Sequence, residues 1–485
     1  MIPEQQKKTV ILLTIDALRA DHLKSYGYHR NTAPYLEKFA EEGSIFLNAI
    51  TNGPESPTAF SSLFTSILPL LDGGFSPLPP EKITLPQLLK ENNINTFAIH
   101  SNPNLGKYFN FDRGFDTFLD GERYKKEPKN SLKLKLIANL KKILDYHNLS
   151  NKLMYRIKGF NRLKTWLRKK IPFLTDILLP FTPIAYNAPY VVNKLNSFLK
   201  TLKKPSFIWA HFMDVHSPYN PPMRNVLSFR KKDFNISERK FLVEQVYPNV
   251  KDIEITPKYV DDLKTLYDAE INFVDEYLAL FLETVKKEIK NDCLIIITAD
   301  HGESFYEHEF FGHQGTIFDE VLRVPLIIVE LGKKSIKNKI NDTIQLIDVT
   351  PTILDYYGIE IPDNFQGVSL LSLIKGKTLR KTGIIISECY QKSGSMKRNE
   401  KEGFLLLAIR NQGWKYIYDE ENNTEFLFNL ELDPRENNNL IDINKEKLSE
   451  FRTIKQHHLK KIAESSREKL KITKSIDKLD LDKFK

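Results

Sequence analysis

Short apolar runs alternate along the chain with longer segments whose apolar residues recur at helical spacing. Unbroken runs of aliphatic and β-branched residues predict strands of a parallel sheet that is buried on both faces. We expect such strands at residues 9–16, 96–100, 206–214, 293–300 and 324–329, and helices at 32–42, 58–66, 85–91, 260–289 and 347–357. This order predicts an α/β fold in which helices sandwich a large, mostly parallel sheet.

The pattern changes after residue 374. Short apolar segments separated by polar turns predict a smaller C-terminal α+β domain that contains an antiparallel sheet, with strands at 383–390, 404–410, 414–418 and 425–429. Residues 445–485 are charged and have helical spacing. We therefore assign residues 1–374 to a catalytic domain, 375–444 to the small domain and 445–485 to a charged helical tail.

The net charge of +9 is concentrated in one segment. Residues 125–170 hold 15 lysines and arginines and only two acidic residues, Glu127 and Asp145. We interpret residues 122–200 as a basic helical insertion, either a solvated cap over the sheet or a surface for anionic lipid or polyanionic glycan. No nucleic-acid-binding motif accompanies the charge, so we expect no nucleic-acid partner.

The cysteine content and the N-terminus bear on the compartment. The two cysteines, Cys293 and Cys389, predict no disulfide framework. The first apolar run is short and contains Asp16, which is typical of neither a signal peptide nor a membrane span. We expect a cytoplasmic protein that can associate with a membrane surface through the basic insertion, with export by another route as an alternative.

Polar side chains follow several of the predicted strands. Asp16 ends the first, Asp214 and His216 follow the third, and Asp300 and His301 follow the fourth. In open α/β sheets, sites form beyond the carboxyl ends of the strands. A single aspartate there is often a turn residue, but several together, with an imidazole, indicate a divalent-metal site.

Ser56 and Pro57 precede a predicted helix. They are typical of an N-cap and a first helical residue, and capping alone would explain them. A hydroxyl at a helix N-terminus is also well placed to act as a metal-bound nucleophile.

At these positions, and along almost its whole length, the sequence resembles sulfatases of the alkaline phosphatase superfamily. The matching segments are TIDALRADHL at 14–23, GFD at 114–116, HFMDVHSPY at 211–219, YDAEI at 267–271, ADHGES at 299–304, DVTPTIL at 348–354 and FNLELDPRE at 428–436. The resemblance implies an alkaline-phosphatase-like fold and an ester-cleaving site.

The resemblance also implies roles for individual residues. Asp16, Asp300 and His301 would hold one divalent metal ion, with Ser56 as the metal-bound nucleophile. The donor set suits calcium, magnesium or manganese, with zinc as an alternative. His216 would contact the transferred group or the leaving oxygen.

Three other residues are candidates to bind substrate. His100 and Asn102 lie at the end of a predicted strand, and His211 lies in another. For His211 we keep the alternative that it only buttresses the end of the sheet.

Two positions depart from the family pattern. Sulfatases make a formylglycine from the first residue of Cys/Ser-x-Pro-x-Arg, whereas residues 56–60 read SPTAF and lack that proline and arginine. We therefore expect no formylglycine. His313 stands where sulfatases have a lysine and resembles lipid-headgroup transferases; it is a candidate general acid or ligand of a second metal, or only a structural polar residue.

The leading hypothesis is a metal-dependent hydrolase that cleaves a sulfate ester, a phosphate ester or a phosphate diester with Ser56. Its substrate would be an anionic ester on a glycan, a lipid or a small molecule. One alternative is a transferase that moves a phospho- or sulfo-linked headgroup onto a glycan or lipid. Another is a catalytically inactive family member that acts as a binding protein.

Overall fold

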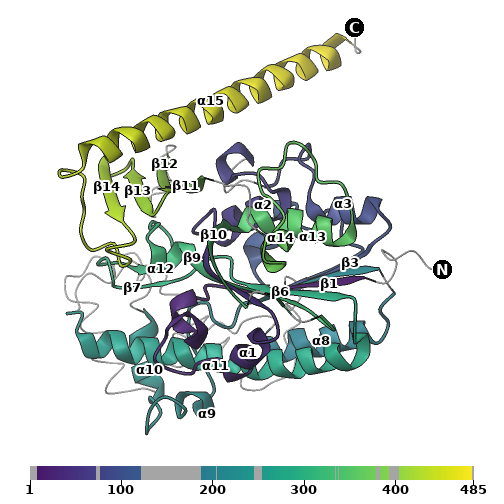
Figure 1. Ribbon diagram of the computed structural model, residues 1–485, viewed down its shortest axis with the longest axis vertical. Helices are drawn as coiled ribbons and strands as arrows, with labels where there is room; N and C mark the ends of the chain where they lie inside the picture. The colour runs from purple at the N-terminus through teal and green to yellow at the C-terminus, as the bar shows by residue number, and fades with distance from the viewer. Residues whose placement is uncertain are drawn as a thin grey trace, which may run out of the picture.

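The computed structural model describes residues 8–72, 77–121, 187–203, 205–244, 254–333, 335–336, 338–377, 383–392 and 403–482. Its main body is an eight-stranded sheet between two layers of helices (Figure 1). The strands lie in the order β10-β2-β9-β6-β1-β5-β3-β4. Their bounds are β1 Thr9–Ile15, β2 Ser44–Ile50, β3 Asn95–His100, β4 Thr117–Asp120, β5 Ser206–Phe212, β6 Cys293–Thr298, β9 Arg323–Glu330 and β10 Lys339–Gln345. The predicted α/β fold is confirmed.

Strand β9 is the exception to the parallel arrangement of this sheet. It pairs antiparallel with β6 and with β2, whereas the other pairs in the sheet are parallel. A parallel neighbour requires a connection that crosses back over the sheet. The chain between β6 and β9 instead forms the small hairpin of β7 (Ser304–Phe305) and β8 (Phe311–Gly312) and then enters β9 through α12 (Asp319–Leu322).

Sequence reasoning missed β2, β4 and β10 for physical reasons. β10 and β4 are the edge strands, and the exposed and buried residues of β10 are mixed rather than continuously apolar. In β2 the pairing register shifts between Phe46 and Ala49, and Asn48 turns its amide to the carbonyl of Asn341 (2.9 Å). Neither feature gives the unbroken apolar run that marks a buried strand.

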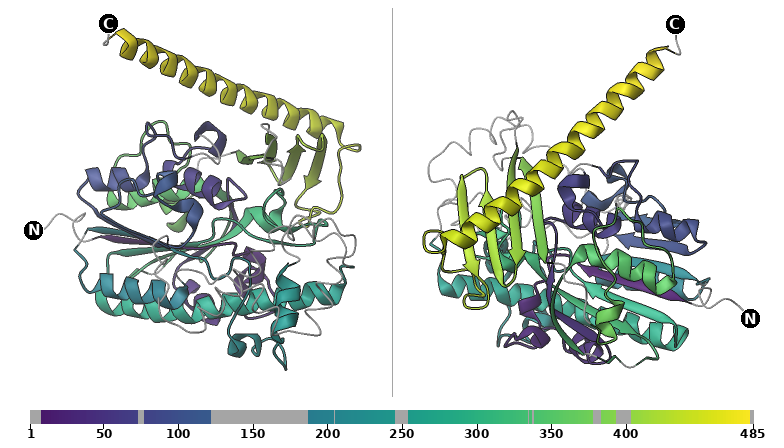
Figure 2. Two further views of the ribbon diagram at one scale, coloured as in Figure 1. Left: turned by 180° about the vertical axis from the view of Figure 1, so that it is seen from behind. Right: turned by 45° about the horizontal axis from the view of Figure 1, so that its top comes forward.

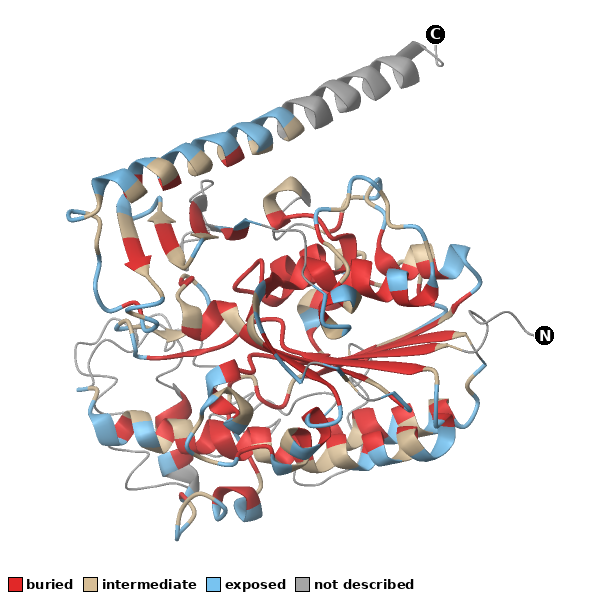
Figure 3. Cartoon of the chain, in the orientation of Figure 1, coloured by how far each residue is buried: buried red, intermediate tan, exposed pale blue. Residues whose placement is uncertain are grey.

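Helices cover both faces of the sheet, with their buried sides toward it (Figure 3). One layer contains α1 (Pro34–Ala40), α8 (Ala188–Leu199) and α11 (Pro257–Ile289), with α9 (Met223–Val226) and α10 (Ile236–Glu244) beside α11. The other contains α2 (Ser56–Thr65), α3 (Leu85–Glu91), α13 (Val349–Tyr357) and α14 (Leu371–Ile374). No described helix has a segment that is both long and apolar enough to cross a membrane.

Helix α8 lies within the range that we interpreted as a basic insertion, 122–200. It packs against α11, and its buried residues, among them Val191 and Leu195, belong to the main core. This end of the range is therefore part of the helical layer. Residues 122–186, including the basic segment 125–170, lie outside the described residues.

The C-terminal part contains the predicted antiparallel sheet. Its strands follow chain order, β11 (Ile384–Lys392), β12 (Gly403–Asn411), β13 (Trp414–Asp419) and β14 (Thr424–Asn429). Helix α15 (Lys445–Asp482) packs its first turns on this sheet through Leu448 and Phe451 and then extends beyond the body (Figure 2). The sheet joins the main body where Glu388 N–H donates to Asn52 O (2.9 Å), four residues before α2.

Candidate active site

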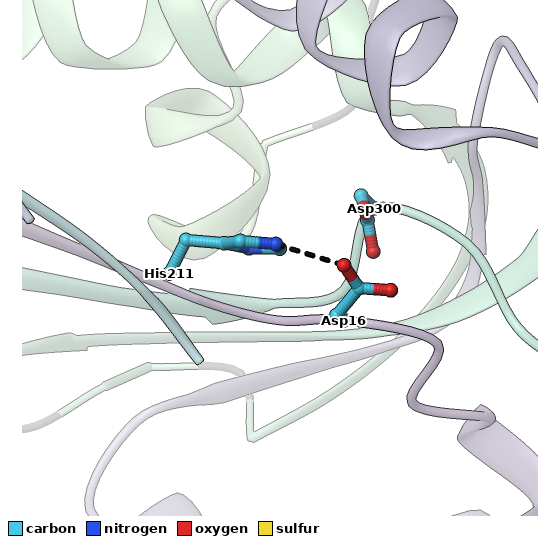
Figure 4. Close-up of side chains that lie close together, drawn as sticks. All are labelled: Asp16, His211 and Asp300. Carbon is cyan, nitrogen blue, oxygen red and sulfur yellow. Dashed lines mark hydrogen bonds and ion pairs between the residues drawn. The ribbon is translucent and has the colours of Figure 1, made fainter. Parts of the chain in front are cut away.

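Asp16 and Asp300 meet at the carboxyl edge of the main sheet because they follow two neighbouring strands. β1 and β6 pair in register up to Thr14 and Thr298, and each aspartate comes two residues later. Figure 4 shows the two carboxylates close together, with the His211 ring from β5 beside Asp16. The strand-end prediction placed both residues in this site.

Three buried ligand atoms converge there and have no hydrogen-bond partner among the described residues: Asp16 Oδ1, Asp300 Oδ2 and His301 Nε2. The imidazole nitrogen lies 3.6 Å from Asp16 Oδ1 and 3.7 Å from Asp300 Oδ2. The remaining atoms are satisfied, since Asp300 Oδ1 accepts the N–H groups of Ala17 (3.3 Å) and His301 (3.0 Å). Buried polar atoms are rarely left unpaired, so these residues fit a bound cation.

The His301 ring is oriented by its other nitrogen. Nδ1 lies 2.8 Å from Gly302 O, a carbonyl that can only accept, so this nitrogen carries the proton. The lone pair of Nε2 therefore faces the two carboxylates, as a metal ligand requires.

His211 and His301 lie near different carboxylate oxygens of Asp16. Its Nε2 is 3.0 Å from Asp16 Oδ2, and its Nδ1 is 2.9 Å from the Thr14 hydroxyl, which also accepts the Trp209 indole N–H (3.1 Å). Asp16, His211 and Asp300 together offer ligand atoms within 4.8 Å of one another and could hold a divalent metal. His211 thus lies against a predicted ligand, and its predicted contact with substrate stays a prediction.

Ser56 stands at the start of α2 with its hydroxyl toward Asp16. Its Oγ lies 3.4 Å from Asp16 Oδ2 and accepts the Asn102 amide N–H (2.9 Å). Asn102 also donates to Asp16 Oδ2 (3.0 Å), so one side chain links the serine to the aspartate. The N-cap is Glu55, which has extended backbone; the prediction that Ser56 is the cap was wrong by one residue.

His313 and His216 complete the site around His301. The His313 ring stacks on His301 with centroids 4.1 Å apart, and the His216 ring lies 5.2 Å from His313. Burial lowers the pKa of His216, but the carboxylates of Asp16 and Glu303 outweigh this effect and raise it. The structure therefore brings His216 and His313 together beside His301 and the carboxylates of Asp16 and Asp300.

Glu303 is a site residue to which sequence reasoning gave no role. Its Oε1 lies 3.0 Å from His313 Nδ1, and its Oε2 accepts the Tyr219 hydroxyl (3.1 Å). Burial raises the pKa of Glu303, but His313, His216 and His301 outweigh this effect and lower it. The contact with His313 arises because Ser304 pairs with Gly312 in the β7–β8 hairpin, which a prediction of short hairpins would have indicated.

His100 lies behind the site in an aromatic cluster. It is fully buried and stacks on Trp209 (centroids 5.4 Å apart). Burial, reinforced by His211, lowers the pKa of His100 to about 3, so the ring is neutral. Its predicted contact with substrate stays a prediction.

Asp214 does not belong to the site, although it follows a strand of the same sheet. Its Oδ1 accepts the N–H of Ala188 (3.0 Å) at the start of α8, while its Oδ2 is buried without a partner. Burial raises the pKa of Asp214 to about 7, against the opposing effect of the Ala188 N–H. This aspartate anchors a helix.

We expect Asp214→Asn to make the protein more stable than the wild type at alkaline pH. The folded protein binds the Asp214 proton up to about pH 7, whereas the unfolded chain releases it near its ordinary pKa of 3.8, so the stability contributed by Asp214 falls between these values. Asparagine keeps the acceptor and removes the buried charge. The unfolding free energy of the variant minus that of the wild type should therefore increase by up to about 4 kcal/mol from pH 4 to pH 8.

Urea unfolding at several pH values measures this difference. Asp363→Asn, at an exposed aspartate, is the control and should show no such trend. A difference for Asp214→Asn that does not change with pH would contradict the prediction.

The fold and the site define the class of protein: a hydrolase with a metal-type centre of buried carboxylates and histidines beside a serine at a helix N-terminus. The sulfatase family matches residues 8–359 of the sequence, and the chain therefore belongs to the sulfatase family. A second match, to the C-terminal part of N-sulphoglucosamine sulphohydrolase, covers residues 306–466. The protein is accordingly an ester hydrolase of the sulfatase and phosphoesterase group.

Individual relatives agree with this assignment. The chain is 24% identical to an arylsulfatase of Clostridium perfringens over 471 residues, which cover 90% of each protein. It is 22% identical to arylsulfatase K of Mus musculus over 453 residues, 90% of this chain and 76% of that one.

Solved structures share the fold. One is the phosphonate monoester hydrolase of Agrobacterium radiobacter (TM-score 0.67, 19% identity, 94% of this chain and 95% of that one). Another was solved in complex with its substrate, D-glucosamine-2-N,6-O-disulfate (TM-score 0.69, 16% identity, 94% of this chain and 98% of that one).

Proposed function

We propose that the protein hydrolyses an ester whose transferred group carries a single negative charge, with unmodified Ser56 as the nucleophile. The class comprises sulfate monoesters, phosphate diesters and phosphonate monoesters. The observation that carries the proposal is the convergence of three unpartnered ligand atoms, on Asp16, Asp300 and His301, beside the Ser56 hydroxyl.

The arrangement supports a two-step displacement. A divalent ion held by Asp16, Asp300 and His301 would lower the pKa of the nearby hydroxyl and offset negative charge. The Ser56 hydroxyl gives its proton to solvent, and its oxygen forms a bond to sulfur or phosphorus as the bond to the alcohol oxygen breaks. His313 gives that alcohol oxygen a proton and later regains one from solvent. Water then cleaves the seryl ester, which restores the hydroxyl and releases the sulfate or phosphoryl product.

The charges around the site favour a singly charged group. Asp16, Asp300 and Glu303 bring three carboxyl groups to the site, all buried. Phe60 stands at the position of the arginine in the formylglycine motif and is fully buried against Trp209 and His211 (centroids 5.0 and 5.1 Å away). These carboxyl groups would repel a second negative charge on the ester, and no arginine at position 60 would offset that charge.

Phe60 also supports an unmodified serine. The motif proline and arginine are replaced by Thr58 and Phe60, and both replacements are fully buried in α2. Phe60 packs the helix against β5, and the Thr58 hydroxyl donates to Glu55 O (2.9 Å).

Four esters with the same leaving group separate the substrate classes: 4-nitrophenyl sulfate, bis(4-nitrophenyl) phosphate, 4-nitrophenyl phenylphosphonate and 4-nitrophenyl phosphate. We expect turnover of at least one of the first three and weaker activity on the last. Metal analysis should find about one divalent ion per chain, and mass spectrometry should find the Ser56 peptide with the mass of serine. A peptide lighter by two hydrogen atoms would overturn the unmodified nucleophile, and a preference for the phosphate monoester would overturn the charge argument.

Carbohydrate sulfates are the natural substrates to test first, because a protein of the same fold was solved with a disulfated glucosamine as its substrate. Sulfated and phosphorylated sugars of matched structure should be compared under the same conditions. Transfer to an added glycan or lipid acceptor, with no release to water, would favour the transferase alternative.

We expect Glu303→Gln to slow esters with poor leaving groups and to spare activated ones. The carboxylate lies 3.0 Å from His313 Nδ1 and orients the proposed proton donor, whereas the amide keeps the shape and loses the charge. Turnover of an alkyl ester should fall about 10- to 100-fold, while that of the 4-nitrophenyl ester changes little.

A matched control lies in α12. Glu320→Gln removes a carboxylate that pairs with a different histidine, His308 (2.8 Å). This pair does not contact Asp16, Asp300 or His301. Equal losses for alkyl and aryl esters in Glu303→Gln would show that Glu303 does not act through a leaving-group proton.

A further inference from the structure

The backbone directly after Asp16 adopts a conformation that its residue does not favour. Ala17 has φ +57° and is fully buried. The left-handed region suits glycine, whereas a β-carbon makes it costly for alanine. Such a conformation persists only where the surroundings hold it.

This residue connects the two strand ends of the metal-type centre. The Ala17 N–H donates to Asp300 Oδ1 (3.3 Å), while Asp16, one residue earlier, supplies the facing carboxylate. If Ala17 relaxed to an ordinary φ, its N–H would turn away from Asp300. The relative orientation of the two carboxylates therefore depends on this peptide unit.

Tyr267, from the middle of α11, holds the turn. Its hydroxyl donates to Ala17 O (2.7 Å) and accepts the N–H of Arg19 (2.8 Å), so a single oxygen ties both sides of the turn. The ring is fully buried and packs edge-on against His22 (centroids 4.9 Å apart) and Phe305 (4.9 Å). The brace is thus rigid, and it belongs to one of the long helices of the fold.

We propose that Tyr267 is a positioning residue for the metal centre. Its hydroxyl holds Ala17 in the left-handed conformation, and this conformation fixes Asp300 relative to Asp16. The inference rests on the proposed metal site. It predicts that the Tyr267 hydroxyl affects metal affinity without touching the metal, and that its importance depends on which residue stands at position 17.

The test measures Mn²⁺ affinity by calorimetry in four full-length proteins: wild type, Tyr267→Phe, Ala17→Gly and the double variant. Tyr267→Phe should weaken Mn²⁺ binding about tenfold in the wild-type background. In the Ala17→Gly background the same change should weaken it less than about threefold, since glycine adopts the turn without the brace. Equal factors in the two backgrounds, or no effect in either, would overturn the inference.

Tyr259→Phe is the matched control on the same helix. Its hydroxyl donates to Leu242 O (2.5 Å), away from the turn, so this variant should bind Mn²⁺ like the wild type. Amide hydrogen exchange of Ala17 in the metal-free proteins gives an independent readout, and it should be faster in Tyr267→Phe than in wild type or Tyr259→Phe.

Other outcomes are also distinguishable. If Tyr267→Phe fails to fold, the double variant should still fold. A double variant that also fails to fold would overturn the inference. A wild type that binds no Mn²⁺, Ca²⁺ or Zn²⁺ contradicts the proposed metal site itself, whereas normal binding with no coupling between positions 17 and 267 contradicts only the brace.

Discussion

Ser56→Ala should lower kcat at least about 10³-fold on every ester that the wild type cleaves, while the protein keeps its metal. The substitution removes the oxygen that lies 3.4 Å from Asp16 and accepts the Asn102 amide. Asp16, Asp300 and His301 all remain, so metal affinity should change by less than about tenfold. Steady-state kinetics and calorimetry on the same preparation measure the two quantities.

Ser62→Ala is the matched control in the same helix. Its hydroxyl is also buried, but it donates to the carbonyls of Thr58 and Ala59 inside α2 (3.0 Å each) and does not reach the site. This variant should keep activity and lose at most a little stability. If Ser56→Ala retained wild-type turnover, a nucleophile other than Ser56 would have to be sought.

Asp300→Asn should abolish tight metal binding and activity together. The amide keeps the shape of the side chain but places at most one weak ligand atom where the carboxylate had an unpartnered oxygen. We expect the metal dissociation constant to rise at least about 100-fold and kcat/KM to fall by a similar factor at limiting metal. Added metal should recover part of the activity.

The stability of this variant distinguishes metal loss from misfolding. Without metal, Asp16 and Asp300 are two buried carboxyl groups that face each other, so Asp300→Asn should melt in EDTA at a temperature no lower than the wild type. It should then gain little on addition of metal, whereas the wild type gains stability by mass action. Asp214→Asn, at a buried aspartate of the same sheet that anchors α8, should keep the full metal response. A fully active, metal-replete Asp300→Asn would contradict the proposed centre.

Three histidines of the site have different surroundings. His301 presents a free lone pair to the carboxylates, His313 is held by Glu303, and the pKa of His216 is raised by the acids around it. In the proposed mechanism, one type of side chain takes different roles according to its neighbours. The groups that contact each ring, a backbone carbonyl for His301 and carboxylates for His313 and His216, set these differences.

The sequence by itself determined the class of fold and the edge of the sheet at which Asp16 and Asp300 meet. Strands that are buried on both faces must be continuously apolar, so their ends are visible in the sequence, and parallel strands bring those ends to one edge. This reasoning placed Asp16 and Asp300 together correctly. It missed β2, β4 and β10, because edge strands and a strand with a register shift lack that signal.

Only the tertiary structure decided which side chains face one another. Asp214 ends a strand like Asp16 yet turns to the first N–H of α8, and Glu303 meets His313 through a hairpin of two-residue strands. Tyr267 reaches Ala17 from a helix 250 residues away in the chain. Local sequence carries no signal for such contacts, because they depend on register, rotamer and the packing of distant elements. The meeting of Asp16 and Asp300 could therefore be predicted from the sequence, whereas the groups that orient them could not.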